Sequence, residues 1–381
     1  MIKPNTPDAE NMAVPSLRAP RLTLTRSRKT TIPVGVDLDD RSIAATAVVA
    51  GRVIAANTGV GALAPGAVNE GEVTDVHAVA AALRQLFSAH DLPKQVRLAI
   101  ANQRVAFRTI RLPVIENPEH LRAAVRFQAQ AEIPMPLESA VLDHQVIGVV
   151  NGEDGNRQLE VAVVAARKES VAPLLDAARR AGLEPVGIDL ASFGMIRALA
   201  GSGSRHSTEV AAEGYVEATL FCNLGDRTNL AIARDRACLF SRVAQFGVGD
   251  IARELTIETG LSDEHAQQWL IYTGLATPVD QLEGDPGTVG KVRDVLSGGV
   301  GRLADELRLS LDFYGGQDGA TPVGDVVLCG WGSAIPGLPE ALEEELGRRV
   351  TAAVPPALAG PGFDPVSAAR LTLSYGLALE Q

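Results

Sequence analysis

Two stretches of this chain repeat one another: VGVDLDDRS at residues 34–42 and LFCNLGDRT at residues 220–228. In each, an apolar run meets a tight polar turn, and a second apolar run follows at 43–48 or 229–233, which predicts a β-hairpin. The turns align as Leu-Asp-Asp-Arg-Ser against Leu-Gly-Asp-Arg-Thr, so the repeat indicates two related halves that face each other. Turns of this kind can direct backbone N–H groups and hydroxyls at phosphates, and a carboxylate beside them can hold a magnesium shell.

The composition is that of an ordinary folded protein. The 381 residues suffice for two domains, and 46% of them are hydrophobic and 21% are charged. The formal net charge of -11 argues against general nucleic-acid binding, which needs a basic surface. No stretch approaches the ~18 apolar residues that span a bilayer. The three cysteines are scattered through apolar runs, which favours a reducing compartment, so we expect a cytoplasmic protein with buried cysteines.

Residues 1–33 differ from the rest of the chain. They hold six basic and two acidic residues, and they are rich in Pro, Ser and Thr without any periodicity. This composition predicts a disordered, solvated tail. The alternative is a weak attraction to an anionic membrane surface, of roughly 1 kcal/mol for each basic residue close to the lipid.

Hydrophobic periodicity predicts strands and helices on both sides of a small, polar linker at 200–214. Before the linker we expect the hairpin at 34–49, strands at 96–101, 104–112, 141–150, 159–166 and 186–190, and helices at 75–90, 117–133 and 170–181. After it we expect a hairpin at 216–234, strands at 237–244 and 326–329, a loop at 278–290, and helices at 250–259, 262–274, 291–314, 338–346 and 368–379. Strand hairpins followed by helices in each half are typical of a mixed α/β sheet duplicated in tandem.

The chain resembles the actin-like ATPase superfamily and, within it, the PilM family of type IV pilus assembly proteins, over about residues 34–381. The most specific stretches are QAQAEIPMPLE at 128–138 with DHQV at 143–146, VVAARKE at 163–169, LSLDFY at 309–314, and CGWGS at 329–333 with IPGL at 335–338. All of them occur in the family's order.

This resemblance implies a duplicated, ribonuclease-H-like fold of two lobes around a nucleotide cleft, similar to the cell-division protein FtsA. We expect the first lobe at 34–214, with a small α/β subdomain inserted at about 96–168. The second lobe is expected at 215–381, with a helical subdomain at about 250–300.

The resemblance also implies a partner and a location. Members of the family act as a cytoplasmic ring component at the inner face of the cell membrane, and they bind the short N-terminal tail of the inner-membrane protein PilN. That tail is expected in a groove between the core of the first lobe and the inserted subdomain. Residues 104–112 and 117–137 are the candidate walls. Other pilus-machine components and a homo-oligomer are further expected partners.

By resemblance, three loops would hold ATP with magnesium. Asp37 would face a magnesium-bound water, and Ser42 with the N–H groups of 39–42 would face the β and γ phosphates. Gly330 and Gly332 would let the backbone pass close to the ribose and α-phosphate, where a Cβ would intrude. The full set of candidate residues is Asp37, Asp39, Asp40, Arg41 and Ser42 in the first loop, Asn223, Gly225, Asp226, Arg227 and Thr228 in the second, and Gly330, Trp331, Gly332 and Ser333 in the third.

The cleft departs from the family pattern at each loop. Asp39 stands where the family usually has Gly, and at an effective ε of about 20 two like charges ~4 Å apart repel by about 4 kcal/mol. Asn223 replaces an Asp of the metal shell, and Trp331 replaces a Gly, where it would clash with the nucleoside or stack on it. Weak or absent ATP binding, binding without turnover, and hydrolysis all stay open.

Asp37, Asp39 and Asp226 also have an interpretation that needs no ligand. Each would form hydrogen bonds within its tight turn, and Arg41 and Arg227 would neutralise these acids.

Two other functions stay open beside a protein-binding adaptor. An FtsA-like, membrane-associated filament protein usually carries an amphipathic helix after a C-terminal linker, and no such segment is recognisable before Gln381. A sugar-kinase-like enzyme needs an Asp base, for which we find no motif. Phosphate-loop, zinc and nucleophile-elbow motifs are absent from the sequence, so no catalytic residue is assigned and efficient catalysis is not expected.

Overall fold

The computed structural model describes residues 33–48, 52–53, 55–152, 155–200 and 217–379. The tail expected over 1–33 and the linker expected over 200–214 lie, except for their end residues Pro33 and Ala200, outside the described residues. In the described part, no helix is long and apolar enough to cross a bilayer. The three cysteines are buried, as expected from the sequence, and none forms a disulfide. Burial raises the pKa of each thiol.

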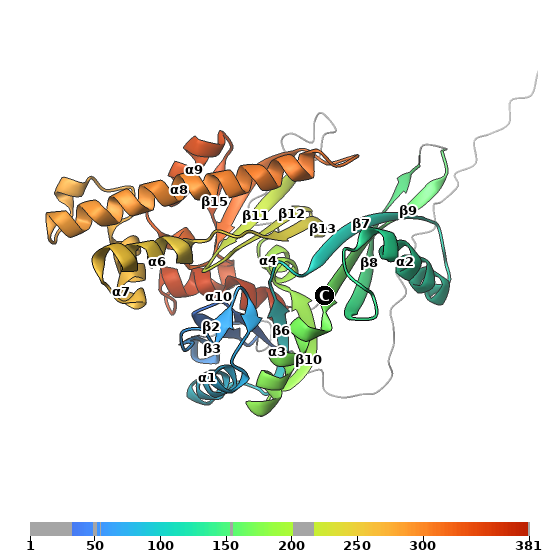
Figure 1. Ribbon diagram of the computed structural model, residues 1–381, viewed down its shortest axis with the longest axis horizontal. Helices are drawn as coiled ribbons and strands as arrows, with labels where there is room; N and C mark the ends of the chain where they lie inside the picture. The colour runs from blue at the N-terminus through green and yellow to red at the C-terminus, as the bar shows by residue number, and fades with distance from the viewer. Residues whose placement is uncertain (1–32, 49–51, 54, 153–154, 201–216, 380–381) are drawn as a thin grey trace, which may run out of the picture. The chain divides into compact units, whose positions relative to one another are not determined.

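The first five-stranded sheet has the order β10-β6-β1-β2-β3 (Figure 1). The first repeated stretch forms β1 (Val34–Leu38) and β2 (Ser42–Thr46), which pair antiparallel and confirm the predicted hairpin. β3 (Thr58–Ala62) continues the antiparallel side, while β6 (Gln95–Ile100) and β10 (Glu184–Leu190) continue the sheet in parallel. The sequence did not predict β3, because its two glycines leave little hydrophobic alternation.

The second five-stranded sheet repeats this topology with the order β13-β12-β11-β14-β15. The second repeated stretch forms the predicted hairpin of β11 (Ala218–Leu224) and β12 (Thr228–Arg234). β13 (Ala237–Val243) adds a third antiparallel strand, and β14 (Val323–Cys329) and β15 (Val350–Ala352) add two parallel ones. The two sheets therefore match strand for strand, which confirms the duplicated α/β architecture.

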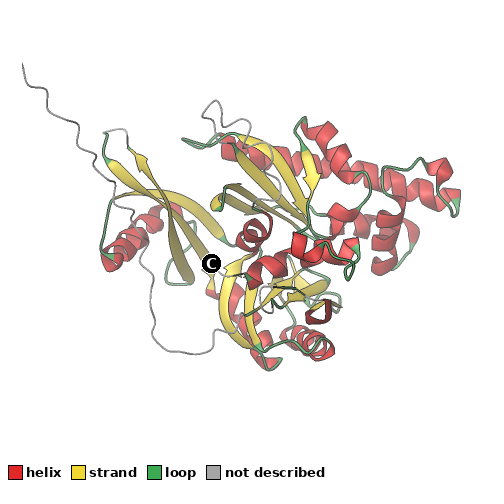
Figure 2. Ribbon diagram, turned by 180° about the vertical axis from the view of Figure 1, so that it is seen from behind, coloured by secondary structure: helices red, strands yellow, loops and turns green. Residues whose placement is uncertain are grey.

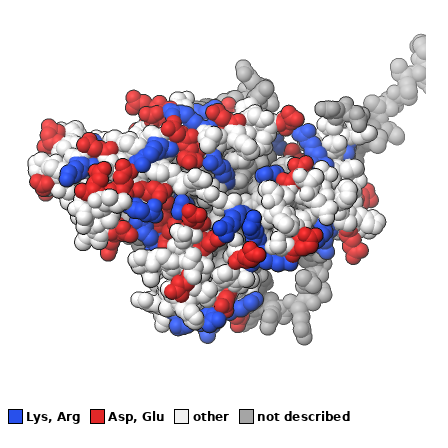
Figure 3. Space-filling view, in the orientation of Figure 1, with Lys and Arg blue, Asp and Glu red and all other residues white. Residues whose placement is uncertain are grey.

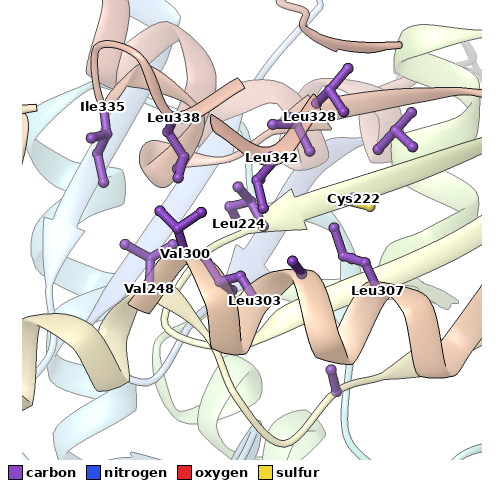
Figure 4. Packing of buried hydrophobic residues seen from close by; sticks show 14 of the residues in the cluster. Cys222, Leu224, Val248, Val300, Leu303, Leu307, Leu328, Ile335, Leu338 and Leu342 are labelled. Atoms are coloured by element: carbon purple, nitrogen blue, oxygen red, sulfur yellow. The ribbon is translucent and has the colours of Figure 1, made fainter. Parts of the chain in front are cut away.

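Helices cover both sheets. The first sheet packs against α1 (Val76–Ala89) and α3 (Lys168–Arg180). The second packs against α6 (Val248–Thr259), α7 (Asp263–Thr273), α8 (Pro286–Gly315) and α9 (Leu338–Leu346), and Figure 4 shows the interdigitated leucines and valines of this core. The remaining short elements are β4 (Val68–Asn69), β5 (Glu72–Val73) and the 3₁₀ turns η1 (Ala55–Asn57), η3 (Val279–Gln281), η4 (Trp331–Ala334) and η5 (Pro356–Leu358).

Helix α8 begins earlier than predicted. Asp285 accepts a hydrogen bond from the N–H of Thr288 at 2.8 Å, and Pro286 takes the first helical position, which suits its fixed φ. The loop predicted at 278–290 is therefore wrong over its last residues. In contrast, Ser262 caps α7 as predicted, and its hydroxyl accepts from the N–H of His265.

A separate three-stranded sheet of order β7-β9-β8 carries one helix on its face (Figures 1 and 2). Its strands are β7 (Ala106–Pro113), β8 (Ala140–Asn151) and β9 (Arg157–Arg167), and its helix is α2 (Pro118–Glu132). Asn117 caps α2 as predicted. β6 pairs within the first sheet although the insertion was expected from about residue 96, and the lobe boundaries stay a prediction.

Two helices join the two large sheets into one core. They are α4 (Ala191–Leu199), which the sequence did not predict, and α10 (Pro365–Ala378). One hydrophobic cluster combines Ile100 of the first sheet, Phe221 and Val327 of the second, and Ile196 and Leu373 of these helices. The last helix therefore stabilises the first sheet as well as the second.

Candidate functional site

The two repeated turns meet and exchange ion pairs. Arg41 donates from Nη2 and Nε to Oδ1 of Asp226 at 2.5 and 2.9 Å, and its backbone N–H donates to Oδ2 at 2.8 Å. Arg227 donates from Nε to Oδ2 of Asp40 at 3.3 Å. Asp40 and Asp226 are equivalent in the alignment, as are the two arginines, so each turn neutralises the acid of the other. Of the acids that Arg41 and Arg227 were expected to neutralise, Asp226 is paired in this way, and the pairs form between the turns and not within them.

Both pairs are largely shielded from water. The side chains of Arg41 and Asp226 are 18% and 4% exposed, and those of Arg227 and Asp40 are 15% and 10% exposed. Burial by itself would lower the pKa of Arg41, but its hydrogen bonds to Asp226 and the charge of that carboxylate outweigh burial and raise it. The guanidinium therefore stays charged in the pair. The remaining oxygen of Asp40 accepts from the N–H of Gly71 at 3.0 Å.

Asp39 has no counterpart in the second turn, where Gly225 stands. Its Oδ2 accepts the backbone N–H of Asp226 at 2.8 Å, and its Oδ1 accepts that of Asp40 at 3.1 Å. A Cβ on Gly225 would lie 2.3 Å from Oδ2 of Asp39, so only glycine leaves room for this carboxyl group. Burial and the charge of Asp226 raise the pKa of Asp39 from 3.8 to about 8, against the opposing charge of Arg370.

A third arginine, which sequence reasoning missed, completes the site. Arg370 of α10 donates from Nη1 to Oδ2 of Asp37 at 2.5 Å and from Nε to Oγ of Ser42 at 2.9 Å. The side chains of Arg370 and Asp37 are only 6% and 5% exposed. Arg370 is the sole charged residue in the apolar run 368–379, and that isolation is the signal that could have found it, because a buried charge needs a partner.

The third loop packs on the protein itself. Gly330 has φ +81°, and a Cβ there would lie 2.5 Å from Oδ1 of Asn223. A Cβ on Gly332 would lie 2.6 Å from the side chain of Val248. Both glycines are therefore required by protein contacts, whereas the sequence explained them by a ligand.

Trp331 and Ser333 also point into the protein. Trp331 is 5% exposed and belongs to the core of the second sheet, so its side chain packs on the protein itself, and a clash or stacking with a nucleoside stays a prediction. The hydroxyl of Ser333 donates to the carbonyl of Gly330 at 2.8 Å. In the second loop, Thr228 is fully buried, and its hydroxyl has no hydrogen-bond partner among the described residues.

The residues present do not fit ATP with magnesium in this arrangement. The oxygen of Asp37 that would face the metal shell carries the guanidinium of Arg370. Within the described ranges, no group of three or more His, Cys, Asp or Glu is placed to hold a metal ion. The first two loops come together, and their charged groups bind one another or Arg370.

A groove of about 610 Å³ lies at a second place, between β7 on one side and β13 with α8 on the other. Its apolar lining includes Phe107 of β7, Phe240 of β13, and Leu309 and Phe313 of α8, and the last two are 57% and 60% exposed. Phe240 and Phe313 pack with ring centroids 5.9 Å apart. Such exposed aromatic and aliphatic side chains in a concave surface are typical of a binding site.

Arginines border this groove. Its lining holds no acidic residue and four arginines: Arg104, Arg108, Arg167 and Arg242. Arg104 pairs with Glu72 and Arg242 with Glu306, whereas Arg108 and Arg167 have no acidic partner among the described residues. In Figure 3, basic side chains gather near the middle of the visible face, and acidic ones are frequent over α6 and α8.

The expected walls of a peptide groove are met in part. Residues 103–108 and 134–135 line the groove, within or next to the two predicted segments. The opposite wall, from β13 and α8, was not predicted, and it belongs to the second half of the chain. A smaller cavity of about 20 Å³, lined by Asn102, Ser192 and Asn229 among others, lies where residues of the first sheet, the second sheet and β7 meet.

Comparison with known proteins shows which family this chain belongs to and which solved structures share its fold. The sequence profile of the family described as "Type IV pilus assembly protein PilM" matches residues 35–359. A solved structure described as "PilM-PilN type IV pilus biogenesis complex" is 25% identical, with a TM-score of 0.72 over 91% of this chain and 97% of that chain. The ethanolamine utilization protein EutJ from Carboxydothermus hydrogenoformans is 14% identical, with a TM-score of 0.51 over 91% of this chain and 88% of that chain, and it shows the fold alone. The actin-like fold predicted from the sequence is thereby confirmed.

Proposed function

The chain belongs to the PilM family of type IV pilus assembly proteins, and on this basis we propose that it is a cytoplasmic adaptor that captures the N-terminal tail of a PilN-like inner-membrane protein. The solved relative is itself described as a complex of PilM with PilN. The apolar groove between β7 and β13 is the observation in this chain that carries the proposal. Binding a peptide requires no catalysis, in keeping with loops whose charged side chains are already paired with one another or with Arg370.

The edges of two sheets make this groove suitable for an extended peptide. β7 pairs only with β9, and β13 only with β12, so each is the edge strand of its sheet in the described part of the chain. An edge strand offers unpaired backbone N–H and C=O groups, to which an extended peptide can add as a further strand. Phe107, Phe240 and Phe313 then supply apolar pockets for alternate side chains of the peptide.

The test is a titration of the purified protein with a fluorescent peptide that copies the N-terminal tail of the PilN-like protein encoded in the same genome. We expect saturable binding, and we expect Phe313→Glu to weaken it at least ~10-fold, because hot-spot aromatics commonly contribute 2 kcal/mol or more. Phe313 is 60% exposed, so this change spares the core.

Ile257→Glu is the matched control. Ile257 is an exposed apolar residue of α6, 78% exposed, and it does not line the groove. It should bind the peptide as the unchanged protein does. Equal losses in both variants, or no loss with Phe313→Glu, would show that the peptide binds elsewhere.

Two finer parts of the proposal rest on the sequence. The six basic residues of 1–33 add a weak, salt-sensitive attraction to anionic lipid at the inner face of the membrane. Co-sedimentation with vesicles of anionic or neutral lipid tests this, and deletion of residues 1–33 should abolish the difference. The second part is assembly into a homo-oligomer or ring with other pilus components, which light scattering of the peptide-bound protein would reveal.

A further inference from the structure

The paired turns carry an inference about nucleotide, independent of the peptide groove. The resemblance implies that the two turns clamp the phosphates of ATP from opposite sides. In this structure they are in direct contact instead, through Arg41 with Asp226 and Arg227 with Asp40. The two contacts are equivalent, because the arginine of each turn binds the aspartate of the opposite turn.

The donors that would face phosphates are already used. The N–H of Asp39 donates to the carbonyl of Ser42 at 2.8 Å, that of Asp40 to the side chain of Asp39 at 3.1 Å, and that of Arg41 to Asp226 at 2.8 Å. The hydroxyl oxygen of Ser42 accepts from Arg370. A phosphate could take these three N–H groups only if their present bonds were exchanged, although the buried hydroxyl of Thr228 in the second turn has no partner among the described residues.

Side chains of the protein also occupy the space beside the turns, and one of them supplies a positive charge there. The carboxyl group of Asp39 sits against Gly225 and takes the N–H of Asp226, the position that an anion would need. At the other end of the same turn, the guanidinium of Arg370 is 2.5 Å from Asp37 and supplies the positive charge that the resemblance assigns to a magnesium shell. The carboxyl group of Asp39 thus lies where the resemblance places a phosphate, and the guanidinium of Arg370 lies where it places the magnesium shell.

We propose that a set of paired side chains forms a latch, which joins the two halves in place of nucleotide and magnesium. Its members are the arginines Arg41, Arg227 and Arg370 and the acids Asp37, Asp39, Asp40 and Asp226. The protein is then held closed by its own side chains, and its affinity for a partner does not depend on ATP. The latch spans 185 residues of sequence between Arg41 and Asp226, and 333 between Asp37 and Arg370, so it fixes the two halves and the last helix at one point.

The first experiment is a calorimetric titration of the full chain with magnesium-ATP, with thermal unfolding in the same buffer. We expect no binding heat and no rise in unfolding temperature at millimolar ligand, because a ligand stabilises a protein only in proportion to its occupancy. Micromolar binding, with a matching rise in unfolding temperature, would overturn the proposal. Neither measurement uses the peptide, so the result does not depend on the proposed adaptor function.

The second experiment asks whether the pairs hold the turns together. Arg41→Gln keeps a polar, though shorter, side chain and removes its charge. We expect the amides of both turns, 34–42 and 220–228, to exchange hydrogen with solvent at least ~10-fold faster in this variant, since opening one turn releases the other. Arg227→Lys, a milder change, should show the same pattern with a smaller effect, and it serves if Arg41→Gln does not fold.

The matched control is Arg197→Gln. Arg197 makes a similarly buried ion pair with Asp189, with side chains 13% and 6% exposed, away from the turns. The proposal requires that this variant leave exchange in both turns unchanged. If it accelerates exchange there as much as Arg41→Gln does, or if Arg41→Gln affects only its own turn, the pairs are not a latch.

Discussion

At the scale of single residues, Asp39 decides how the two turns fit. Its carboxyl group reaches across to the backbone of the second turn, and the absence of a side chain at Gly225 makes the room for it. Burial raises its pKa to about 8, so in the folded protein the group keeps a proton over a pH range in which the unfolded chain, with the ordinary pKa of 3.8, has lost it. The folded state therefore binds more protons than the unfolded state between these two values.

The pH dependence of stability follows from that difference. The contribution of Asp39 to the free energy of unfolding is full below pH 3.8 and declines as pH rises towards 8, by at most about 1.4 kcal/mol per pH unit. Asp39→Asn has no proton to lose. Urea unfolding at about pH 5 and about pH 8 should thus show the variant gaining stability relative to the unchanged protein at the higher pH.

The difference in free energy of unfolding between the two proteins at a single pH is not the test. Asn replaces one of the two oxygens of Asp39 that accept hydrogen bonds, and this loss is present at every pH. Only the change of this difference with pH reports the titration. A constant difference across the range would mean that Asp39 is ionised in the folded state. Asp176→Asn, a change in an exposed pair on α3, provides the control for general effects of charge.

Arg370 should be needed for stability in a different way. Arg370→Met leaves the carboxylate of Asp37 buried without its partner, and removing one member of a buried pair typically costs about 3–5 kcal/mol. The double variant Asp37→Asn with Arg370→Met has no unpaired charge and should recover much of this loss. Urea denaturation of four proteins measures it: the unchanged protein, Arg370→Met, Asp37→Asn and the double variant. If the two single losses simply add in the double variant, the residues are not coupled.

Sequence reasoning identified most residues of the site but not their partners. The repeated turns revealed Asp37 to Ser42 and Asn223 to Thr228, and the resemblance added the third loop. What could not be predicted is that Asp226 would bind Arg41, since each residue lies in its own local turn and the pairing depends on how two sheets approach. The same holds for Arg370, whose partner is 333 residues away.

At the scale of elements, the contact of α10 with β1 is unusually close. A Cβ on Gly35 would lie 1.9 Å from the backbone carbonyl oxygen of Ser374, and the hydroxyls of Thr46 and Ser374 are hydrogen-bonded at 2.7 Å. Backbone meets backbone here, so no side chain can move aside. The first residue pair of the repeated stretch, Val34-Gly35, is therefore fixed by a helix from the other end of the sequence.

Gly35→Ala should consequently destabilise the protein by about 1–3 kcal/mol or more, because the added methyl group must push the helix away. Gly61→Ala is the matched control. Gly61 lies in β3 of the same sheet, and a Cβ there would only reach ordinary contact with Leu86 at 3.5 Å. Thermal unfolding of both variants compares them, and equal effects would mean that α10 moves without cost.

Elements with strong local signals were predicted well. α2 and α7 begin at the Asn and Ser that cap them, and both repeated hairpins are present. β3 and α4 were missed. Glycines interrupt the pattern of β3, and α4 is buried on most sides, so it shows no polar face that would mark a helical period. Tertiary contacts, which local sequence does not contain, determine both.

At the scale of the whole described chain, the two halves share a core. The cluster around Ile196 and Leu373 contains residues of both large sheets, and the turns join the halves a second time. We expect a single cooperative transition in calorimetry, with equal calorimetric and van't Hoff enthalpies. Two resolved transitions would indicate halves that fold independently, in spite of this shared core.

The duplicated fold could be predicted because the repeat and the resemblance both report on it. The position of the peptide groove could not, since its second wall combines β13 with α8 and arises only when the three-stranded sheet lies against the second half. The sequence predicts these segments individually. The groove, however, depends on how the segments contact one another in the folded protein.

The position of α10 has a consequence for protein synthesis. The strands that it covers, β1 and β2, leave the ribosome long before residues 365–378 do, because α10 follows them at the far end of the described chain. Until then the face of the first sheet that carries Gly35, Ala44 and Thr46 lacks the helix that covers it in the folded protein. The nascent chain must therefore hold the first sheet with one face uncovered until residues 365–378 have been made, and chaperones that bind exposed strands can act during that interval.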